Sequence, residues 1–534
     1  MSLIDILVIA IYIIGILVIG LWVVRKQKLS AEGYFLAGHS LKWPVIGAAL
    51  FASNISTIHL VGLAASGFND GLVWGNFEWM AVFVLIILGL IFAPFYYKTK
   101  IATLPEFLEL RYNATARTCL AILAMLGALF MHIGVSLYAG AVVFEHFFGL
   151  NIYVSILSIS LITAIYTVIG GLESVVITET IQTIILIIGT VVLTAFGFMA
   201  LPDYGIHTWE ALKAAAKPDQ LSMIPSPVNT SGLTWSAILL GYPVLGVWYW
   251  CADQTIVQRV LAAKTLNDAK IGPLFAAVIK ILPVFILVLP GVLGYVLFGD
   301  IISDANDTFP VLISELLPTG LKGLMVAALL AALMSTIAAA LNSAGTLVSI
   351  DIVKRYNPEV SDKRQVLIGR VTAVIVMLVA ISWSPLVARF NSIFEAITVL
   401  LSVISPPITA VFLWGVFWKR GNSQGALATF IGGFVLGLTA FLIDFPTFGD
   451  VKIITETWGI SFMMQAWWLF VCCSVIFVVA SLLTPQPDYS RIKSCTMNSP
   501  LDFLKNEEGE TRNLPLMISG LLIVTMILLY IIFS

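Results

Sequence analysis

The chain has 534 residues, of which 59% are hydrophobic and only 11% are charged. A water-soluble globular protein carries about 25% charged residues, so this composition excludes an ordinary soluble domain and indicates a polytopic membrane protein. The formal net charge of −2 gives no sign of the basic surface that binds nucleic acid, and we expect no nucleic-acid partner.

Segments of about 20 mainly apolar residues, the length that crosses a lipid bilayer, recur along the whole chain. We predict an all-α fold with about 14 transmembrane helices and no soluble domain. The predicted segments cover roughly residues 3–24, 44–66, 76–97, 117–147, 151–169, 174–199, 236–253, 271–298, 320–352, 366–388, 392–418, 425–444, 464–483 and 515–533.

The first segment, MSLIDILVIAIYIIGILVIGLWVVRK, has an acidic leading end, no small-residue cleavage site and an apolar core too long for a signal peptide, so we expect it to be retained. Basic residues in short loops stay on the cytoplasmic side. If the connection from Arg25 to Lys42 is cytoplasmic, most of the 28 Lys and Arg residues fall in cytoplasmic loops or at their edges. We therefore predict a multi-pass protein of the plasma (inner) membrane, embedded in the lipid bilayer, with both termini outside.

The second segment contains the polar stretch ASNISTIHLVGLAASG at residues 52–67. Ser, Asn and Thr side chains compete with the backbone for its own hydrogen bonds, so the stretch predicts a local break in the helix. A helix broken near the bilayer midplane offers carbonyl oxygens to a cation and side chains to a solute. The alternative is that these groups only bond to their own backbone and pack against other helices.

Lys280 lies about ten residues inside an apolar segment, too deep for its ammonium group to reach the membrane surface easily. A carboxylate or a polar ligand must accept its protons, and Glu78 of the third segment is the natural partner. Ionisable groups at such depth usually mark the path of a substrate or ion. A purely structural Glu–Lys pair is the alternative.

Two further stretches carry polar or aromatic groups in membrane segments. WYWCADQTIVQR (248–259) presents Tyr249 and Trp250, and an aromatic platform suits the apolar face of a sugar ring, although aromatic residues also line membrane interfaces. AALLAALMSTIAAALNSAGTLVSID adds the adjacent hydroxyls of Ser335 and Thr336 to a face of small residues that lets another helix approach. Several neutral oxygens suit a monovalent cation that must also leave again.

The chain resembles the sodium/solute symporter family, and within it the sodium/glucose cotransporter branch, over nearly its full length. GGLES (170–174) and GVFWKRGNSQGA (415–426) look like the two family signatures, while WYWCADQTIVQRVLAAK (248–264) and ASNISTIHLVGLA are close to the animal glucose cotransporters. The resemblance implies a leucine-transporter-like core of two inverted five-helix repeats. The whole chain, 1–534, would then be one transporter domain, with a leading helix at 3–24, the core at 44–418 and additional helices at 425–534.

The resemblance further implies a secondary active transporter, not an enzyme, that couples sodium entry to uptake of a glucose- or galactose-like hexose by alternating access. Sodium is the coupling ion, and no cofactor is expected. Carried over by position, the sodium site would use carbonyls of Ala52, Ile55 and Ala332 with the hydroxyls of Ser335 and Thr336. The sugar site would use Asn54, His59, Glu78, Tyr249, Trp250 and Lys280. Glu179 is a candidate for a second sodium site.

The chain departs from the family pattern at three positions, Ala81, Gly246 and Thr398, where relatives carry more polar or larger side chains near the sugar. The same fold could therefore carry another solute, such as an inositol, a monocarboxylate, an amino acid or sialic acid. Lys280 would suit a carboxylate, whereas the aromatic pair with Asn, His and Glu suits a polyol. An intramembrane enzyme is disfavoured because the five histidines do not cluster in a ligand spacing, and a channel would need a pore loop or a ring of repeated units.

Overall fold

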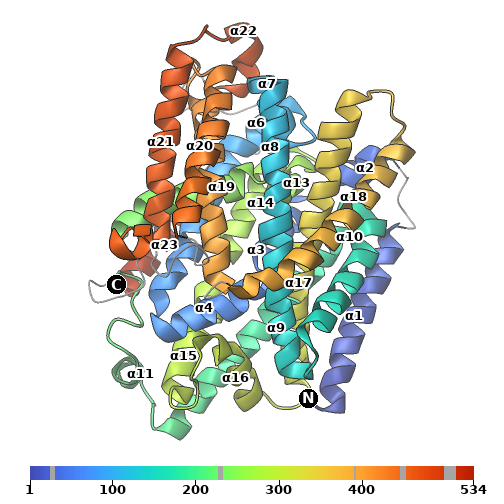
Figure 1. Ribbon diagram of the computed structural model, residues 1–534. Coiled ribbons are helices and arrows are strands. Elements are labelled where there is room, and N and C mark those ends of the chain that lie inside the picture. The colour runs from blue at the N-terminus through green and yellow to red at the C-terminus, as the bar shows by residue number, and fades with distance from the viewer. Residues whose placement is uncertain (25–29, 226–232, 390–392, 445–452, 498–512) are drawn as a thin grey trace.

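Backbone groups in lipid have no water to bond, so apolar segments fold as helices that satisfy these groups internally. In the computed structural model most long helices run between the two ends of one bundle, with α7 and α22 at the upper end and α11 and α16 at the lower end (Figure 1). The structure describes residues 1–24, 30–225, 233–389, 393–444, 453–497 and 513–534, with only the backbone course for residues 24, 388, 389 and 393–399. Within these ranges it contains helices and one isolated bridge, Leu41 to Ala263, but no strand.

The first half of the chain runs as far as α11, at the lower end of the bundle in Figure 1. Its helices are α1 Leu3–Val24, α2 Ala31–Leu36, α3 Trp43–Asn54, α4 Thr57–Asn69, α5 Asn76–Ile87, α6 Ala93–Thr99, α7 Leu104–Arg111, α8 Ala114–Leu126, η4 Gly127–Val135, α9 Ser136–Phe148, α10 Ile152–Ala200 and α11 Trp209–Ala215.

The second half contains the helices that complete the bundle. They are α12 Tyr242–Val247, η7 Trp248–Ala252, α13 Gln254–Leu261, α14 Leu266–Ile279, α15 Leu289–Phe298, α16 Thr308–Leu316, α17 Leu321–Thr346, η10 Leu347–Lys354, α18 Asp362–Trp383, α19 Ile393–Phe417, α20 Ser423–Asp444, α21 Phe462–Leu482, α22 Tyr489–Ile492 and α23 Leu514–Ile532.

Eleven helices of the described residues are long and apolar enough to cross a membrane, or twelve if the bent pair α3–α4 counts as one span. Two of the predicted segments, 151–169 and 174–199, form the two halves of α10, which are separated by a kink at Gly171, where the backbone is not helical (φ 63, ψ −167). The predicted segment at 236–253 is a shorter apolar helix, Ala237–Ala252. The prediction of a polytopic all-helical protein is confirmed, while the count of fourteen stays a prediction.

Helix α17 is the buried centre of the bundle. Almost every residue from Gly323 to Thr346 is buried, and the helix packs against α10, α1 and α18. Its small residues permit this approach, because Ala and Gly let neighbouring backbones come close. The position of α17 places its mid-helix hydroxyls against the polar stretch of the second predicted segment.

The motif GGLES forms a bend inside α10. Gly171 adopts φ +63, and a Cβ at this position would lie 2.6 Å from the carbonyl oxygen of Tyr34. The hydroxyl of Tyr34 donates to the carbonyl of Val168, one turn earlier in α10, at 2.9 Å. Only glycine accommodates both the left-handed conformation and the close approach, so the motif seats the segment 31–39 against the helix.

The motif GVFWKRGNSQGA forms the joint between α19 and α20. Arg111 is 1% exposed and donates to the carbonyls of Gly415 at 2.6 Å, Trp418 at 3.0 Å and Gly421 at 3.1 Å. A helix end leaves carbonyls without intrahelical partners, and a guanidinium at that end satisfies them and suits the helix dipole. The joint is therefore held by a residue about 300 positions earlier in the chain.

The segment after α11 holds the end of α4. Gln220 is buried and donates to the carbonyls of Gly67 at 3.0 Å and Phe68 at 2.9 Å, while the ammonium of Lys217 donates to those of Phe68 and Asn69. Gly71 has φ +89 and lies so close to Gln220 that a Cβ would come within 2.1 Å of the carbonyl oxygen of that residue. These contacts hold the C-terminal end of α4 in place.

Replacing Arg111 tests the joint. Arg111→Lys keeps a positive charge but cannot bond three carbonyls in a fixed fork, so we expect a loss of roughly 2–4 kcal/mol in the free energy of unfolding. Thermal unfolding of the detergent-purified protein measures it. The same change at the exposed Arg364 is the control and should have little effect. Equal melting temperatures for both variants would contradict the role of Arg111.

Candidate functional site

The second predicted segment is broken where its polar residues lie. Helices α3 and α4 meet at an angle of 63°, with Ile55 and Ser56 in extended conformation between them. Ser56 begins α4 through a capping box, since its hydroxyl accepts from the backbone N–H of His59 while the His59 ring accepts from the backbone N–H of Ser56, at 3.3 Å. The predicted break is confirmed, and its cause is local: Ser and His side chains replace the missing backbone bonds.

A second break separates η7 from α13. The π-helical turn Trp248–Ala252 ends at Asp253, which has φ −87 and ψ 120. The Asp253 carboxylate accepts from the backbone N–H of Thr255 at 2.9 Å and so caps α13. Two interrupted helices thus lie inside the bundle, each with a side-chain cap at its restart.

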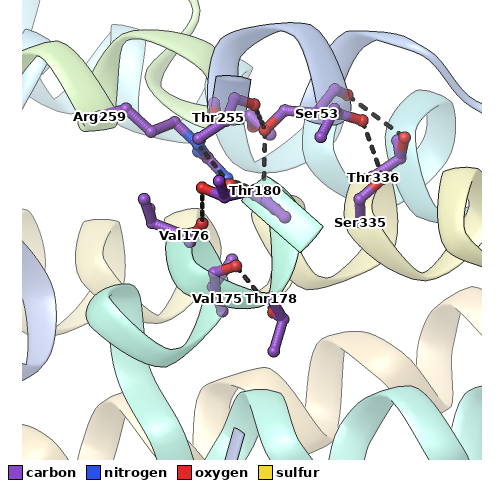
Figure 2. Close-up of polar contacts among 12 residues, drawn as sticks. Ser53, Val175, Val176, Thr178, Thr180, Thr255, Arg259, Ser335 and Thr336 are labelled. Carbon is purple, nitrogen blue, oxygen red and sulfur yellow. Dashed lines mark hydrogen bonds and ion pairs between the residues drawn. The ribbon is translucent and has the colours of Figure 1, made fainter. Parts of the chain in front are cut away.

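The hydroxyls of α17 meet the carbonyls of the first break (Figure 2). Ser335 Oγ donates to Ala52 O at 2.8 Å and to Ala332 O at 2.9 Å. Thr336 Oγ1 donates at 3.2 Å to Ala332 O and to Ser53 O. The structure therefore gathers Ala52, Ala332, Ser335 and Thr336 of the predicted sodium set in one cluster of neutral oxygens, with Ile55 at the break itself.

Ser53 joins this oxygen cluster although sequence reasoning did not assign it. The last turn of a helix before a break leaves several carbonyls free, so the neighbours of Ala52 were candidates from sequence alone. The backbone of Ser53 faces α17, and its side chain faces the opposite direction, toward α10.

All six residues predicted for the sugar site line one cavity. They come from both breaks and from α5 and the C-terminal end of α14: Asn54, His59, Glu78, Tyr249, Trp250 and Lys280. Thr336 also lines the cavity, so the oxygen cluster and the cavity share a border. Most of the remaining wall is apolar or aromatic, as is usual for a small-molecule site.

Glu78 and Lys280 form the buried ion pair expected from the sequence. Their side chains are 3% and 1% exposed, respectively. The Lys280 ammonium also lies 5.6 Å from the centroid of the Trp250 ring, and the Trp250 and Tyr249 rings meet edge-on at 5.1 Å. Charge, hydrogen-bonding groups and aromatic faces are therefore combined on one side of the cavity.

Glu179 is engaged by a buried arginine. Arg259 Nη2 lies 2.5 Å from Glu179 Oε1, and Ser53 Oγ donates to the same oxygen at 2.9 Å. Both charged side chains are fully buried. The guanidinium supplies the positive charge that a second sodium ion would have brought, so this geometry gives no support to a second ion at Glu179.

Two of the three departures from the family pattern border the cavity. Ala81 and Gly246 line it, although the space beside Gly246 is filled by the side chains of Tyr242 and Val84. The side chain of Thr398 lies outside the described residues. The cavity also includes Phe77, Met131, His132, Ser136 and Tyr242, which sequence reasoning did not assign to the site. His132 carries a local signal, because an ionisable group inside a membrane segment is costly and usually marks a substrate or ion path. The apolar and aromatic members carry none, since residues of this kind recur throughout a membrane protein.

A solute cavity bordered by an oxygen cluster, at the junction of two broken helices inside a membrane bundle, defines a secondary transporter. Two solved transporters share the fold. A Na+-coupled sialic acid symporter in a substrate-bound, outward-open state superposes with a TM-score of 0.74 at 20% identity, covering 91% of this chain and 99% of that one. Mhp1, a nucleobase-cation-symport-1 family transporter, gives 0.53 at 14% identity, covering 86% and 97%. The fold is thus the leucine-transporter-like fold.

The chain belongs to the sodium:solute symporter family, whose model matches residues 34–433. It is 34% identical to sodium/glucose cotransporter 1 of Oryctolagus cuniculus, over 95% of this chain and 83% of that protein. It is 37% identical to sodium/myo-inositol cotransporter 2 of Bos taurus, over 83% and 70%. It is 35% identical to a sodium/mannose cotransporter of Bos taurus, over 93% and 89%. The protein is a multi-pass membrane transporter and not an enzyme.

The Glu78–Lys280 pair predicts a specific pattern of stability. Lys280→Met alone leaves a buried carboxylate without its partner and should cost about 3–5 kcal/mol of unfolding free energy. The double variant Glu78→Gln/Lys280→Met removes both charges and should recover most of that loss. Thermal unfolding of the purified wild type, Glu78→Gln, Lys280→Met and the double variant measures these losses; losses that simply add would mean that the two groups do not interact.

Proposed function

We propose that the protein couples sodium entry to the uptake of a hexose such as glucose or galactose by alternating access, in the plasma membrane with both termini outside. The observation that carries the proposal is the shared wall between oxygen cluster and cavity. Thr336 contributes to both, and the break at residues 54–56 borders both. The family assignment supports sodium coupling, and relatives named for glucose, mannose and myo-inositol support a polyhydroxylated solute.

The sodium ion is proposed to bind the carbonyls of Ala52, Ile55 and Ala332 with the hydroxyls of Ser335 and Thr336. All these ligands are neutral oxygens, which bind a monovalent cation weakly enough to release it. The inward gradient and the membrane potential, worth about 2.3 kcal/mol per charge per 100 mV, would draw the ion to this depth. No cofactor is part of the proposal.

The sugar is proposed to lie against the aromatic pair Tyr249 and Trp250. An aromatic ring matches the apolar face of a hexose, and the hydroxyls at the sugar's edge need donors and acceptors. Asn54 Oδ1 is buried without a hydrogen-bond partner among the described residues, and His59, Glu78 and Lys280 offer further polar atoms. Tyr249 would also close the inner side of the cavity, as the resemblance to the family implies.

Ion and sugar would be coupled through the first break. An ion that bridges Ala52 and Ser335 would order the last turn of α3, which carries Asn54 into the sugar cavity. A sugar that orders Asn54 would favour the ion in return, because such coupling is reciprocal. Each ligand thus lowers the ordering cost that the other must overcome.

A carboxylate solute is less compatible with the cavity. Glu78 already pairs with Lys280, and the aromatic ring of Trp250 covers another side of the ammonium. A carboxylate would have to compete with a buried partner of the same charge. Among the alternatives from the sequence, an inositol therefore remains the nearest to a hexose.

Uptake into proteoliposomes tests the proposal. Radiolabelled glucose and galactose should accumulate under an inward sodium gradient and not under an equal potassium gradient. Ser335→Ala removes one proposed ligand and should raise the sodium concentration for half-maximal uptake at least about tenfold, equivalent to the loss of about 1.4 kcal/mol of binding free energy.

Ser343→Ala is the matched control, because Ser343 is a buried serine of the same helix whose hydroxyl bonds to no described residue. It should leave the sodium dependence of uptake unchanged. If neither hexose moves under any cation, the sugar assignment fails, and myo-inositol, carboxylates and amino acids are tested next. If Ser335→Ala behaves like Ser343→Ala, the sodium site lies elsewhere.

A further inference from the structure

A histidine and an aspartate that the proposed sugar site does not use meet at the edge of the cavity. His132 Nε2 lies 2.7 Å from Asp253 Oδ2, and the two side chains are 5% and 4% exposed. His132 comes from the π-helical stretch η4, and Asp253 is the residue at which the second broken helix restarts. The pair therefore joins a continuous membrane span to a helix break 121 residues away.

The Asp253 carboxylate serves two partners at once. Its Oδ2 contacts the His132 ring, and its Oδ1 accepts from the backbone N–H of Thr255 and caps α13. Because both oxygens are used, the carboxylate has a fixed orientation. A helix cap on one side and an imidazole on the other hold the group in place.

This arrangement decides which ring nitrogen of His132 carries a hydrogen. A carboxylate oxygen only accepts, so Nε2 is the protonated nitrogen and donates to Asp253. In the neutral imidazole Nδ1 is then an acceptor. Nδ1 makes no hydrogen bond to any residue that the structure describes.

The His132 ring borders the solute cavity. It lines the same wall as Ser136 and lies 5.9 Å, centroid to centroid, from the ring of Tyr249. As an acceptor at the cavity wall, Nδ1 can take a hydrogen bond from a donor that enters the cavity. The hydroxyl of a sugar that lies against Tyr249 is a donor of the right chemistry and in the right place.

We propose that His132 is a solute-binding residue that accepts a hydrogen bond from one sugar hydroxyl, and that Asp253 is the positioning residue that fixes its tautomer. The inference rests on the proposed function, since it requires a hydroxylated solute in the cavity. It also connects the bound solute to the second broken helix. Through His132 and Asp253 a bound sugar is linked to the first turn of α13, just as Asn54 links it to the end of α3.

Deoxy sugars test the role of His132. For wild-type protein in proteoliposomes, each monodeoxy form of the transported hexose competes with the labelled sugar, and the loss of affinity at each position is measured. With His132→Leu, the loss at one position should fall from about tenfold to less than about twofold, because the hydroxyl there no longer has an acceptor. The losses at the other positions should stay as in wild type. His146→Leu, at an exposed histidine of the same membrane span, should change none of them.

Asp253→Asn tests the positioning role without removing the cap, because Asn caps a helix about as well as Asp. The Asn amide can donate to Nε2, which places the hydrogen on Nδ1 and turns that nitrogen from acceptor into donor. A hydroxyl that donates to Nδ1 in the wild type must then turn its hydrogen away, so the loss of affinity on removing that hydroxyl should change at this position alone. The sugar concentration for half-maximal uptake should rise about tenfold. A purely structural aspartate would instead weaken all positions alike.

Each result has one meaning. If wild-type protein transports no hexose, the proposed function fails before His132 is tested. If wild-type protein transports hexose while His132→Leu keeps every deoxy penalty, the inference about His132 is overturned and the proposed function stands. If His132→Leu does not fold, Asp253→Asn decides: an unchanged penalty at every position overturns the inference.

Discussion

The structure depends on one constraint: a backbone group inside a membrane must find a partner within the protein. The interruption at Ile55 and Ser56 breaks this rule locally, and much of the surrounding structure compensates for it. The capping box of Ser56 and His59 supplies the first bonds of α4. Helix α17 supplies hydroxyls to the carbonyls that α3 leaves free. The hydrogen-bonding groups at the break are thus a necessity of the backbone before they are a binding site.

Buried charge follows the same logic. Glu78 is paired with Lys280, and Glu179 with Arg259, so each of these four groups has an opposite charge beside it. Desolvating such groups costs several kcal/mol each, and pairing offsets most of that cost. Ser53 connects the two systems, since its carbonyl belongs to the oxygen cluster and its hydroxyl to the Glu179–Arg259 pair. A rearrangement at the break therefore cannot leave the ion pair untouched.

Much of this was predictable where the signal is local. The polar run at 52–60 predicted the break, and the depth of Lys280 required a partner, for which Glu78 was the natural choice. Contacts between distant segments were not predictable: nothing near Arg259 in the sequence indicates Glu179, and nothing near His132 indicates Asp253. The division of 151–199 into two helical segments was predictable as well, because the glycine pair of GGLES indicates a helix end, and Gly171 leaves the helical conformation there with φ 63 and ψ −167. The two signature motifs were identified by their resemblance to the family. Their structural roles, the bend of GGLES against Tyr34 and the joint of GVFWKRGNSQGA bonded to Arg111, could be seen only in the folded structure.

The hydroxyls of Ser335 and Thr336 bond to carbonyls that are proposed to bind the ion, those of Ala52 and Ala332. An arriving cation therefore competes with the protein's own hydrogens, and each hydroxyl must rotate its hydrogen away before its oxygen faces the ion. The exchange lowers the net gain of binding, because one set of interactions replaces another. It also lowers the barrier to leaving, since the departing ion is replaced at once by bonds already within reach. A transporter must bind and release its ion in every cycle. Hydrogen bonds that replace the departing ion therefore favour fast turnover and lower the affinity for the ion.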